Sequence, residues 1–413
     1  MQSNYSRIYY YLFACLVFFI PLSKAIPNII LALLSVLFLF KLKREDIVIF
    51  KNRYVQLLII LIILITTNSL WGITLVEDAH ILGRFSLVPL ILILGSKVMN
   101  TKIVKCFFVA GVNILVFMSL FSLLLFYIST KDFVFGNSKS VEDILTLGRP
   151  YIGFLCVLNV LVSLQLSNHK LRILYKIIFL VSSALSITLI ILISARLSLL
   201  SLLLILFIRI FYLKKINRKR RKIVTISFFV ALLATGLAVF TNKNMSERFF
   251  IEETYEKSIN KMMVYEPRIV IWNCVSNIMN SKDFNILLGN QGFDKTTNEL
   301  VNCYENTIEN VSKRNYFLRE KFNTHNQFFG LLISHGLLAT LILLLIFANG
   351  IYFNLYKFYD FSIVLIFLLF FLVENVLFRQ LGCYIFGVFI CLFFMGNSDP
   401  KNSGEKQLEN NYN

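Results

Sequence analysis

The sequence predicts an all-α polytopic membrane protein with about twelve transmembrane helices and one large external loop between spans nine and ten. Hydrophobic residues make up 57% of the chain, charged residues 15%, and the mean hydropathy is +0.72, which excludes an ordinary soluble protein. Apolar runs long enough to cross a bilayer as a helix recur from one end to the other. A transmembrane barrel would instead show short segments of alternating hydropathy.

Each expected span is an apolar run dominated by Leu, Ile and Phe, with few ionisable residues inside it. Turns or charged connections separate consecutive runs. In order, the expected spans are 8–22, 27–41, 54–71, 81–96, 103–128, 150–167, 172–193, 196–213, 223–241, 327–349, 359–377 and 380–396.

Basic residues in short connections mark the cytoplasmic side of a membrane protein. They gather in 41–53, 97–105 and 169–176, and most densely in 214–222, which together carry much of the formal net charge of +18. With twelve spans and a cytoplasmic N-terminus, all four connections face the cytoplasm. The run 214–222 has no interleaved aromatic residues, so we interpret it as a topological anchor and expect no nucleic-acid partner.

This orientation divides the chain into four segments. Residues 1–241 hold spans one to nine, and 242–326 form the external loop. Residues 327–396 hold spans ten to twelve, and the polar segment 397–413 is expected to be a disordered cytoplasmic tail. A cleavable signal peptide is the alternative for the first apolar run, but the charge pattern favours a first transmembrane helix.

The external loop contains a predicted amphipathic helix over 268–281, preceded by Pro267, a residue suited to a first helical turn. We expect this helix to lie on the membrane surface or on the helix bundle. Gly289 and Gly292 predict a tight turn after it. The apolar stripe of the helix is expected to comprise Ile269, Trp272, Val275, Ile278 and Met279.

Two cysteines, Cys274 and Cys303, fall in the external loop, and the sequence leaves open whether they form a disulfide. No metal-ligand spacing, phosphate-binding glycine loop or nucleophile motif occurs in the chain. We therefore expect neither a metal nor a cofactor.

Six arginines and one histidine are predicted to lie on or near the external side, where positively charged residues are normally scarce. A cation at the edge of the hydrocarbon is costly unless an anion receives it, and a phosphorylated lipid substrate is the simplest anion. These residues are Arg84, Arg149, Arg196, Arg268, Arg319, Arg379 and His325.

Most of these arginines also have a structural interpretation. Arg196 is pinned in a very short turn and would then only extend along the membrane edge. Arg268 would form a surface salt bridge with Glu266 or another acid, and Arg379 an ion pair with Glu374. Arg84 and Arg149 would each be a membrane anchor, because they lie at the starts of spans four and six.

His325 lies where the external loop ends and span ten begins. As a neutral imidazole it could accept a proton from a sugar hydroxyl. The alternative is a polar residue that only caps the start of the helix. His335, further along the same span, is expected to be a buried packing residue.

Three blocks of residues resemble the O-antigen ligase and polymerase superfamily of bacterial envelope enzymes. The resemblance covers about 150–345, and the remaining chain matches by topology only. The blocks are Ser194-Ala195-Arg196-Leu-Ser-Leu-Leu, then Arg268-Ile-Val-Ile-Trp272 with Leu287-Leu-Gly-Asn-Gln-Gly292, and finally His325-Asn326-Gln-Phe-Phe-Gly-Leu-Leu-Ile-Ser-His335-Gly336-Leu.

The resemblance implies a metal-independent, GT-C-like glycosyltransferase of the bacterial inner membrane. Its donor would be a glycan linked to undecaprenyl diphosphate, and its active site would face the periplasm. Arg196 and Arg268 match the family's diphosphate-binding arginines and His325 its catalytic histidine. Arg149 matches the family's diphosphate-binding arginines more loosely. Arg84 is included as a fourth diphosphate-binding candidate because it lies at the start of span four. Possible supporting residues are Arg319, Glu374, Arg379, Trp272 and Asn326.

Two activities share this chemistry, a single displacement with inversion at the anomeric carbon. A ligase would join the polysaccharide to a sugar of lipid A–core, and this is the leading interpretation. A polymerase would join it to another lipid-linked repeat. A non-enzymatic transporter is a third alternative, which would be expected to contain paired repeats with interrupted helices.

Overall fold

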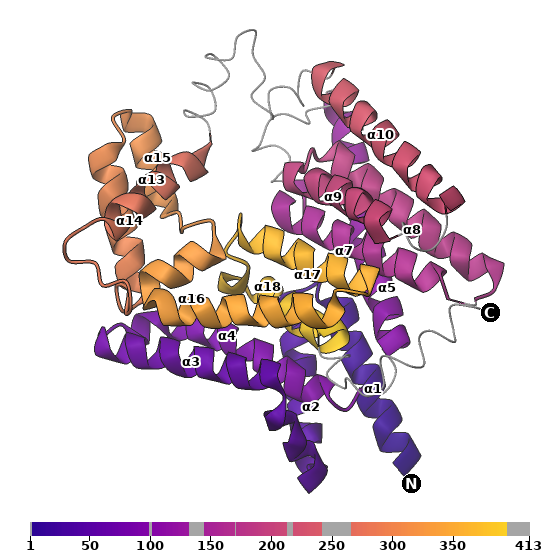
Figure 1. Cartoon of the computed structure of the whole chain (residues 1–413), viewed down its shortest axis with the longest axis horizontal. Helices are drawn as coiled ribbons and strands as arrows, with labels where there is room; N and C mark the ends of the chain where they lie inside the picture. The colour runs from indigo at the N-terminus through magenta and orange to yellow at the C-terminus, as the bar shows by residue number, and fades with distance from the viewer. Residues whose placement is uncertain are drawn as a thin grey trace. The chain divides into compact units, whose positions relative to one another are not determined.

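The computed structural model describes residues 2–98, 101–131, 144–169, 171–212, 218–241 and 266–394, and within these ranges all regular secondary structure is helical (Figure 1). Six of the helices are long and apolar enough to cross a membrane. The chain is therefore a helical membrane protein. The predicted tail 397–413 and the first part of the predicted loop, 242–265, lie outside the described residues.

Each of the twelve expected spans overlaps an α-helix of its own, while the number that crosses the membrane stays a prediction. The chain divides into two compact units, described separately below, and α1 (Gln2–Phe19) and α2 (Ile26–Phe40) contribute to both. The first unit contains η1 (Arg44–Lys51), α3 (Arg53–Trp71), α4 (Leu75–Gly95), α13 (Pro267–Met279), α14 (Phe293–Thr307), α15 (Val311–Glu320), α16 (Gln327–Asn354), α17 (Phe358–Phe371), η2 (Val376–Phe378), α18 (Gln380–Phe389) and η3 (Ile390–Phe394). The second contains α5 (Thr101–Thr130), α7 (Arg149–Ser167), α8 (Ile173–Leu192), α9 (Arg196–Tyr212) and α10 (Arg218–Thr241).

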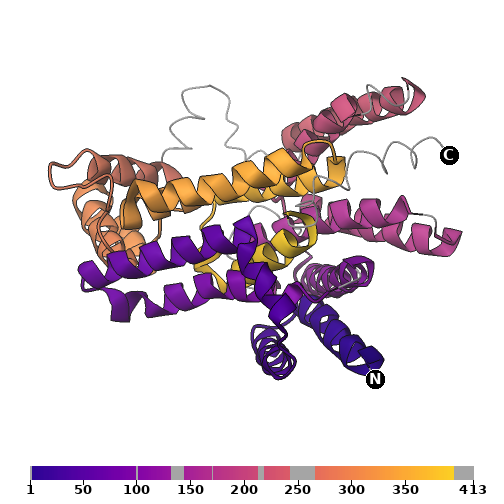
Figure 2. The same ribbon diagram turned by 60° about the horizontal axis from the view of Figure 1, so that its bottom comes forward.

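In the first unit, α3 packs against α4 and α16, and α18 packs against α4. Phenylalanines fill the space between α16, α17 and α18: the ring of Phe371 lies 5.0 Å from that of Phe347 and 4.9 Å from that of Phe386. Helices α13, α14 and α15 gather at one end of α3, α4 and α16 in both views (Figures 1 and 2). The last part of the predicted loop is therefore a folded helical layer.

Helix α13 packs through a face that differs from the predicted stripe. Ile271, Cys274, Val275 and Ile278 are buried, whereas Trp272 stays partly exposed at the edge of this face. The buried face is fixed by α14, because Cys274 forms a disulfide with Cys303, with a Cα–Cα distance of 5.8 Å. The apolar partners of this face include Leu300, Tyr304, Phe317 and Ile333.

Helix α16 is interrupted at Gly336, where the sequence predicted one continuous span. The backbone of Gly336 has φ 79° and ψ −173°, a conformation that favours glycine. The break frees carbonyl groups, and the segment 286–292 supplies donors: Asn290 N–H bonds the Ile333 carbonyl at 2.7 Å and Gly292 N–H bonds the Ser334 carbonyl at 3.0 Å. The predicted glycine turn is therefore docked directly on the broken helix.

Asp78, near the start of α4, fixes the other end of this segment. Its buried carboxylate accepts backbone N–H groups from Phe293 at 3.1 Å and Asp294 at 3.0 Å, the first two residues of α14. Hydroxyl groups of Ser69 and Thr74 donate to the same carboxylate. A helix N-terminus favours a negative charge, so Asp78 attaches α14 to the turn between α3 and α4.

In the second unit, α7 is central and is buried around most of its circumference by α5, α8 and α9. Polar side chains link the helices inside this apolar bundle. The Asn159 amide donates to Ser182 and Ser186 of α8 at 3.0 Å and 2.8 Å and to Asn113 of α5 at 3.2 Å. Such hydrogen bonds between helices stabilise membrane bundles that lack a hydrophobic driving force.

Candidate functional site

His325 lies between α15 and α16 in a constrained backbone conformation. Its φ is 45°, in the left-handed region that residues with a Cβ seldom adopt, and its backbone N–H donates to Asn323 Oδ1 at 3.1 Å. The imidazole is partly buried, with 22% of the side chain exposed. The ring is thus held in place while one edge remains accessible.

Glu374, in the connection between α17 and η2, is hydrogen-bonded to this imidazole. Its Oε2 lies 3.2 Å from His325 Nδ1. Burial by itself would raise the pKa of the Glu374 carboxyl, but the hydrogen bond and charge of His325 and the charges of Arg268 and Arg379 hold that pKa below its usual value. Glu374 is therefore a carboxylate at neutral pH.

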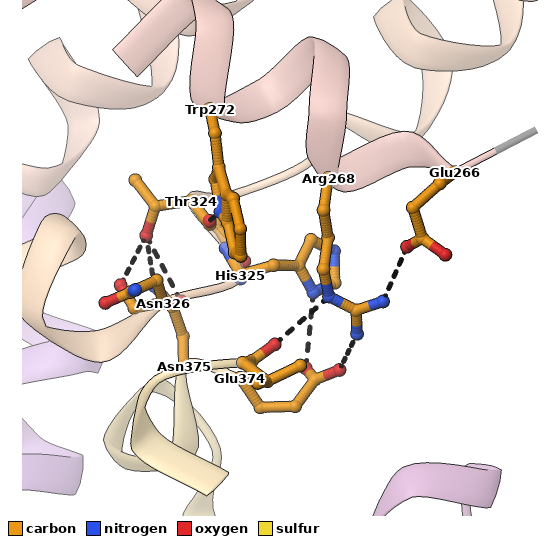
Figure 3. Close-up of polar contacts among 10 residues, drawn as sticks. Glu266, Arg268, Trp272, Thr324, His325, Asn326, Glu374 and Asn375 are labelled. Atoms are coloured by element: carbon orange, nitrogen blue, oxygen red, sulfur yellow. Dashed lines mark hydrogen bonds and ion pairs between the residues drawn. The ribbon is translucent and has the colours of Figure 1, made fainter. Parts of the chain in front are cut away.

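Arg268 supports Glu374 from the other side. Its Nη2 donates to Glu374 Oε1 at 2.7 Å, its Nη1 to Glu266 Oε1 at 2.8 Å, and its Nε to the Val373 carbonyl at 3.3 Å. Figure 3 shows the carboxylate of Glu374 between the guanidinium and the imidazole. This pairing matches the structural interpretation of Arg268, and its predicted role as a diphosphate ligand stays a prediction.

The segment that carries His325 is also fixed by hydrogen bonds on its far side. Trp272 Nε1 donates to the Thr324 carbonyl at 3.0 Å, and Asn375 Nδ2 donates to Thr324 Oγ1 at 3.0 Å. Asn326 Oδ1 accepts the backbone N–H groups of Phe328 and Phe329 at 2.9 Å and 3.0 Å, which makes Asn326 the N-cap of α16. Trp272 and Asn326 therefore position the loop on either side of His325.

The chemistry of the imidazole follows from these contacts. A carboxylate accepts a proton but cannot donate one, so the contact with Glu374 selects the tautomer that carries its hydrogen on Nδ1. The other ring nitrogen, Nε2, then presents a lone pair and has no partner among the residues that the structure describes. An imidazole held in this way by a carboxylate is an arrangement that enzymes use for general bases.

Three other predicted arginines of this unit have different surroundings. Arg84 was expected at the start of span four, but α4 begins at Leu75, so Arg84 lies in the middle of the helix and donates to the Phe378 carbonyl. Arg379 is the N-cap residue of α18, near enough to Glu374 to lower its pKa. Arg319 is mostly exposed and pairs with Glu320 at 3.0 Å.

The remaining two predicted arginines, Arg149 and Arg196, lie in the second unit. Arg149 is the first residue of α7 and is 5% exposed, and none of its guanidinium nitrogens has a partner among the described residues. Arg196 is the first residue of α9 and is half-buried. The turn before it ends α8 by two backbone bonds, from Ser194 N–H to the Ile191 carbonyl at 3.0 Å and from Ala195 N–H to the Ile190 carbonyl at 3.1 Å.

No group of three or more His, Cys, Asp or Glu side chains in the described part of the chain is arranged to hold a metal ion. Thr324 and Asn375 belong to the cluster around His325 but were not predicted from the sequence. Asn375 fell inside the expected span 359–377, and its signal was its place directly after an acid, Glu374. No model of a known protein family matches the chain, and a search of curated proteins finds no significant match.

Proposed function

We propose that the chain is a glycosyltransferase that moves a lipid-linked glycan from undecaprenyl diphosphate to a sugar hydroxyl. The observation that carries this proposal is the chain of contacts from Arg268 through Glu374 to His325. These contacts supply a fixed base beside an accessible edge. The resemblance to O-antigen ligases and polymerases supplies the class of substrate.

In the proposed reaction, the acceptor oxygen attacks the anomeric carbon while the bond from that carbon to the diphosphate oxygen breaks. The hydroxyl proton passes to Nε2 of His325, and undecaprenyl diphosphate leaves with the bonding electron pair. Attack from the face opposite the leaving group inverts the anomeric centre. Glu374 stabilises the imidazolium that forms, and Arg268 keeps Glu374 ionised and oriented.

The leaving diphosphate gains negative charge and needs cationic partners. Of the four arginines predicted for this task, Arg84 and Arg268 are engaged with the chain itself, by a carbonyl and by two carboxylates. Arg149 and Arg196, the first residues of α7 and α9, stay candidates through the resemblance alone. Their guanidinium groups match phosphoryl oxygens in geometry as well as charge.

The disulfide supports placing the active site on the periplasmic side of the bacterial inner membrane. Disulfides persist in oxidising compartments and are rare in the cytoplasm. Cys274 and Cys303 join α13, the helix that carries Arg268, to α14. Lipid-linked donors that have been flipped across the membrane are available on that side.

The acceptor determines whether the enzyme is a ligase or a polymerase, and the contacts around His325 suit both. A ligase with a lipid A–core acceptor is the leading interpretation of the resemblance. The lipopolysaccharide of a strain in which this gene has been deleted distinguishes the two activities. Loss of all attached polymer indicates a ligase, and a product with a single repeat indicates a polymerase.

A transporter would use an interrupted helix to bind an ion or solute through its free backbone groups. Helix α16 is interrupted, but carbonyls at its break are already bonded. Ile333 and Ser334 accept N–H groups from the segment 286–292, and the His335 carbonyl accepts Asn68 Nδ2 at 3.2 Å. The break therefore attaches a loop, which favours the enzyme over the transporter.

The test is His325→Ala in the full chain, reconstituted with an undecaprenyl-diphosphate glycan and candidate acceptors. We expect transfer to fall by about 10²–10⁴-fold, the usual contribution of a positioned acid–base group, while donor binding is retained. His80→Ala is the matched control, since His80 is exposed on α4. Near-normal transfer by His325→Ala would exclude this base.

A further inference from the structure

A row of ring side chains leads from the surface of α15 to His325. The ring centroid of Tyr316 lies 5.4 Å from that of Phe322, and the centroid of Phe322 lies 5.8 Å from that of the His325 imidazole. Tyr316 is 40% exposed, and Phe322 and His325 are partly exposed. We call these three residues the aromatic strip. Surface aromatic side chains are enriched where proteins bind a partner, because they provide a wide contact area at a low cost in conformational entropy.

The aromatic strip is fixed by the packing beneath it. Phe317 is 1% exposed, and its ring lies 5.2 Å from that of Tyr304 and 5.0 Å from that of Phe322. The Tyr304 hydroxyl also donates to the Phe322 carbonyl at 3.0 Å. Tyr304 directly follows Cys303, which the disulfide attaches to α13. Little of the protein must therefore be ordered when a ligand binds to the strip, which favours affinity.

Two residues in left-handed conformations bring the strip together. Lys321, the C-cap of α15, has φ 46°, and His325 has φ 45°. A residue with a Cβ atom incurs about 1–2 kcal/mol in this conformation. The reversal at Lys321 lets Phe322 pack against Tyr316, one turn back in the chain. Backbone strain of this kind is concentrated at functional sites, and here it places one ring between the surface of α15 and the base.

The exposed face of α15 places polar groups beside the strip. Residues three and four apart lie on one face of a helix, and this face carries Ser312, Asn315, Tyr316 and Arg319. The Arg319 guanidinium, which also pairs with Glu320, lies 5.6 Å from the centroid of the Tyr316 ring. A sugar has C–H groups on the faces of its ring and hydroxyls around the rim. Flat aromatic rings with hydroxyl, amide and guanidinium groups beside them match that distribution.

We propose that the aromatic strip and this face of α15 bind an oligosaccharide, with sugar rings on Tyr316 and Phe322 and one hydroxyl beside His325. The strip extends two ring-to-ring steps from the imidazole, so the ligand contacts it through more than one sugar residue. Binding of an oligosaccharide follows from the strip itself. Its assignment as the acceptor of the transfer reaction rests on the proposed function.

The indole of Trp272 provides the measurement. Its Nε1 donates to the carbonyl of Thr324, the residue before His325, and the only other tryptophan in the chain is Trp71. Trp71→Phe therefore leaves one fluorescent reporter beside the strip. This variant is titrated in a detergent without a sugar headgroup. The probes are two lipid-free oligosaccharides from the lipopolysaccharide of the strain that carries this gene: the core oligosaccharide and the repeat unit.

We expect at least one oligosaccharide to change the Trp272 emission in a saturable way. Adding Tyr316→Ala should weaken that binding by about 10-fold or more, the scale on which loss of an aromatic anchor affects an interface. Tyr316→Phe keeps the ring and should bind almost as the parent does. Tyr352→Ala is the matched control, because Tyr352 is 75% exposed at the other end of α16. Thermal midpoints of the variants confirm that each is folded.

Binding of the core oligosaccharide supports a ligase acceptor at the strip, and binding of the repeat unit supports a polymerase acceptor. No response to either probe, or equal affinities in the Tyr316→Ala variant and its parent, would overturn the inference. An equal loss in Tyr316→Phe and Tyr316→Ala would exclude stacking on the ring. The titration needs neither donor nor transfer, and His325→Ala should still bind the oligosaccharide, so its outcome is independent of the test of the base.

Discussion

Arg149 and Arg268 occupy similar positions in their helices but have opposite surroundings. Each lies within the first two residues of a helix and beside a proline, Arg149 before Pro150 and Arg268 after Pro267. Arg268 donates to two carboxylates and a carbonyl, while the more deeply buried Arg149 has no described partner. One guanidinium is thus part of the internal framework, and the other lacks the anion that its burial requires.

The difference shows that the position of an arginine in the sequence does not identify what it binds. Both were predicted to contact a diphosphate because both lie where cations are scarce. A cation with protein carboxylates on two sides orients those carboxylates, whereas a cation without them can receive a ligand. The three predictions below test this distinction, from the largest expected change in stability to the smallest.

The largest effect is expected for Arg268→Met. Removing one partner of a largely buried ion pair leaves the other charge uncompensated, which costs about 3–5 kcal/mol, and Glu374 is the charge left behind. The thermal midpoint in detergent should fall clearly. An unchanged midpoint would show that Arg268 is not part of the framework. Arg268→Lys, which keeps the charge but loses the bidentate fork, should give an intermediate value.

Glu374→Gln should have a smaller effect on stability, about 1–3 kcal/mol, because an amide can still accept some of the hydrogen bonds. Transfer should fall by about 10- to 100-fold, the scale seen when a carboxylate that orients a functional histidine is removed.

The pH dependence gives a second measurement on the same variant. The pKa of Glu374 is lowered in the folded protein, so its contribution to stability is present above the usual carboxyl range and is lost as the pH falls through the folded pKa. The native midpoint should therefore decrease in acid more than that of Glu374→Gln. Parallel curves would contradict this role.

The smallest effect is expected for Ser194→Gly, and its sign is opposite. Glycine adopts the left-handed conformation without the cost of about 1–2 kcal/mol that a Cβ atom incurs, so the variant should be slightly more stable. Ser201→Gly, inside α9, is the control and should be less stable instead.

Much of the fold was predictable because helix-length apolar runs and charged connections follow directly from the chemistry of the bilayer. The errors concern where the helices meet. The expected span 81–96 begins six residues after Leu75, the first residue of α4, and so leaves out Asp78, which is buried as the cap of α14. The face of α13 was assigned by periodicity, which cannot show that Cys274 would be bonded to Cys303.

The sequence identified His325, Glu374 and Arg268 individually but not their connection. Glu374 was expected to interact with Arg379, five residues away, and the charge of Arg379 does lower its pKa. Its bonds to Arg268 and His325, which are 106 and 49 positions distant, were not expected. Hydropathy and spacing describe neighbours along the chain, so contacts between distant segments are beyond them. The lone charge of Arg149 could likewise be seen only when burial was known.

The interruption of α16 has a consequence for the order in which the protein is made. The segment 286–292 leaves the ribosome before Ile333, Ser334 and Gly336, the residues that receive it. It cannot dock until the following span has been inserted, although the Asp78 carboxylate that caps α14 is already in place. Gly336 must also stay glycine, since a Cβ atom there would lie 2.0 Å from the Leu287 carbonyl oxygen. The loop that leads to His325 therefore matures late in biogenesis, and the base is held in position only after the connection that carries Glu374 has been synthesised.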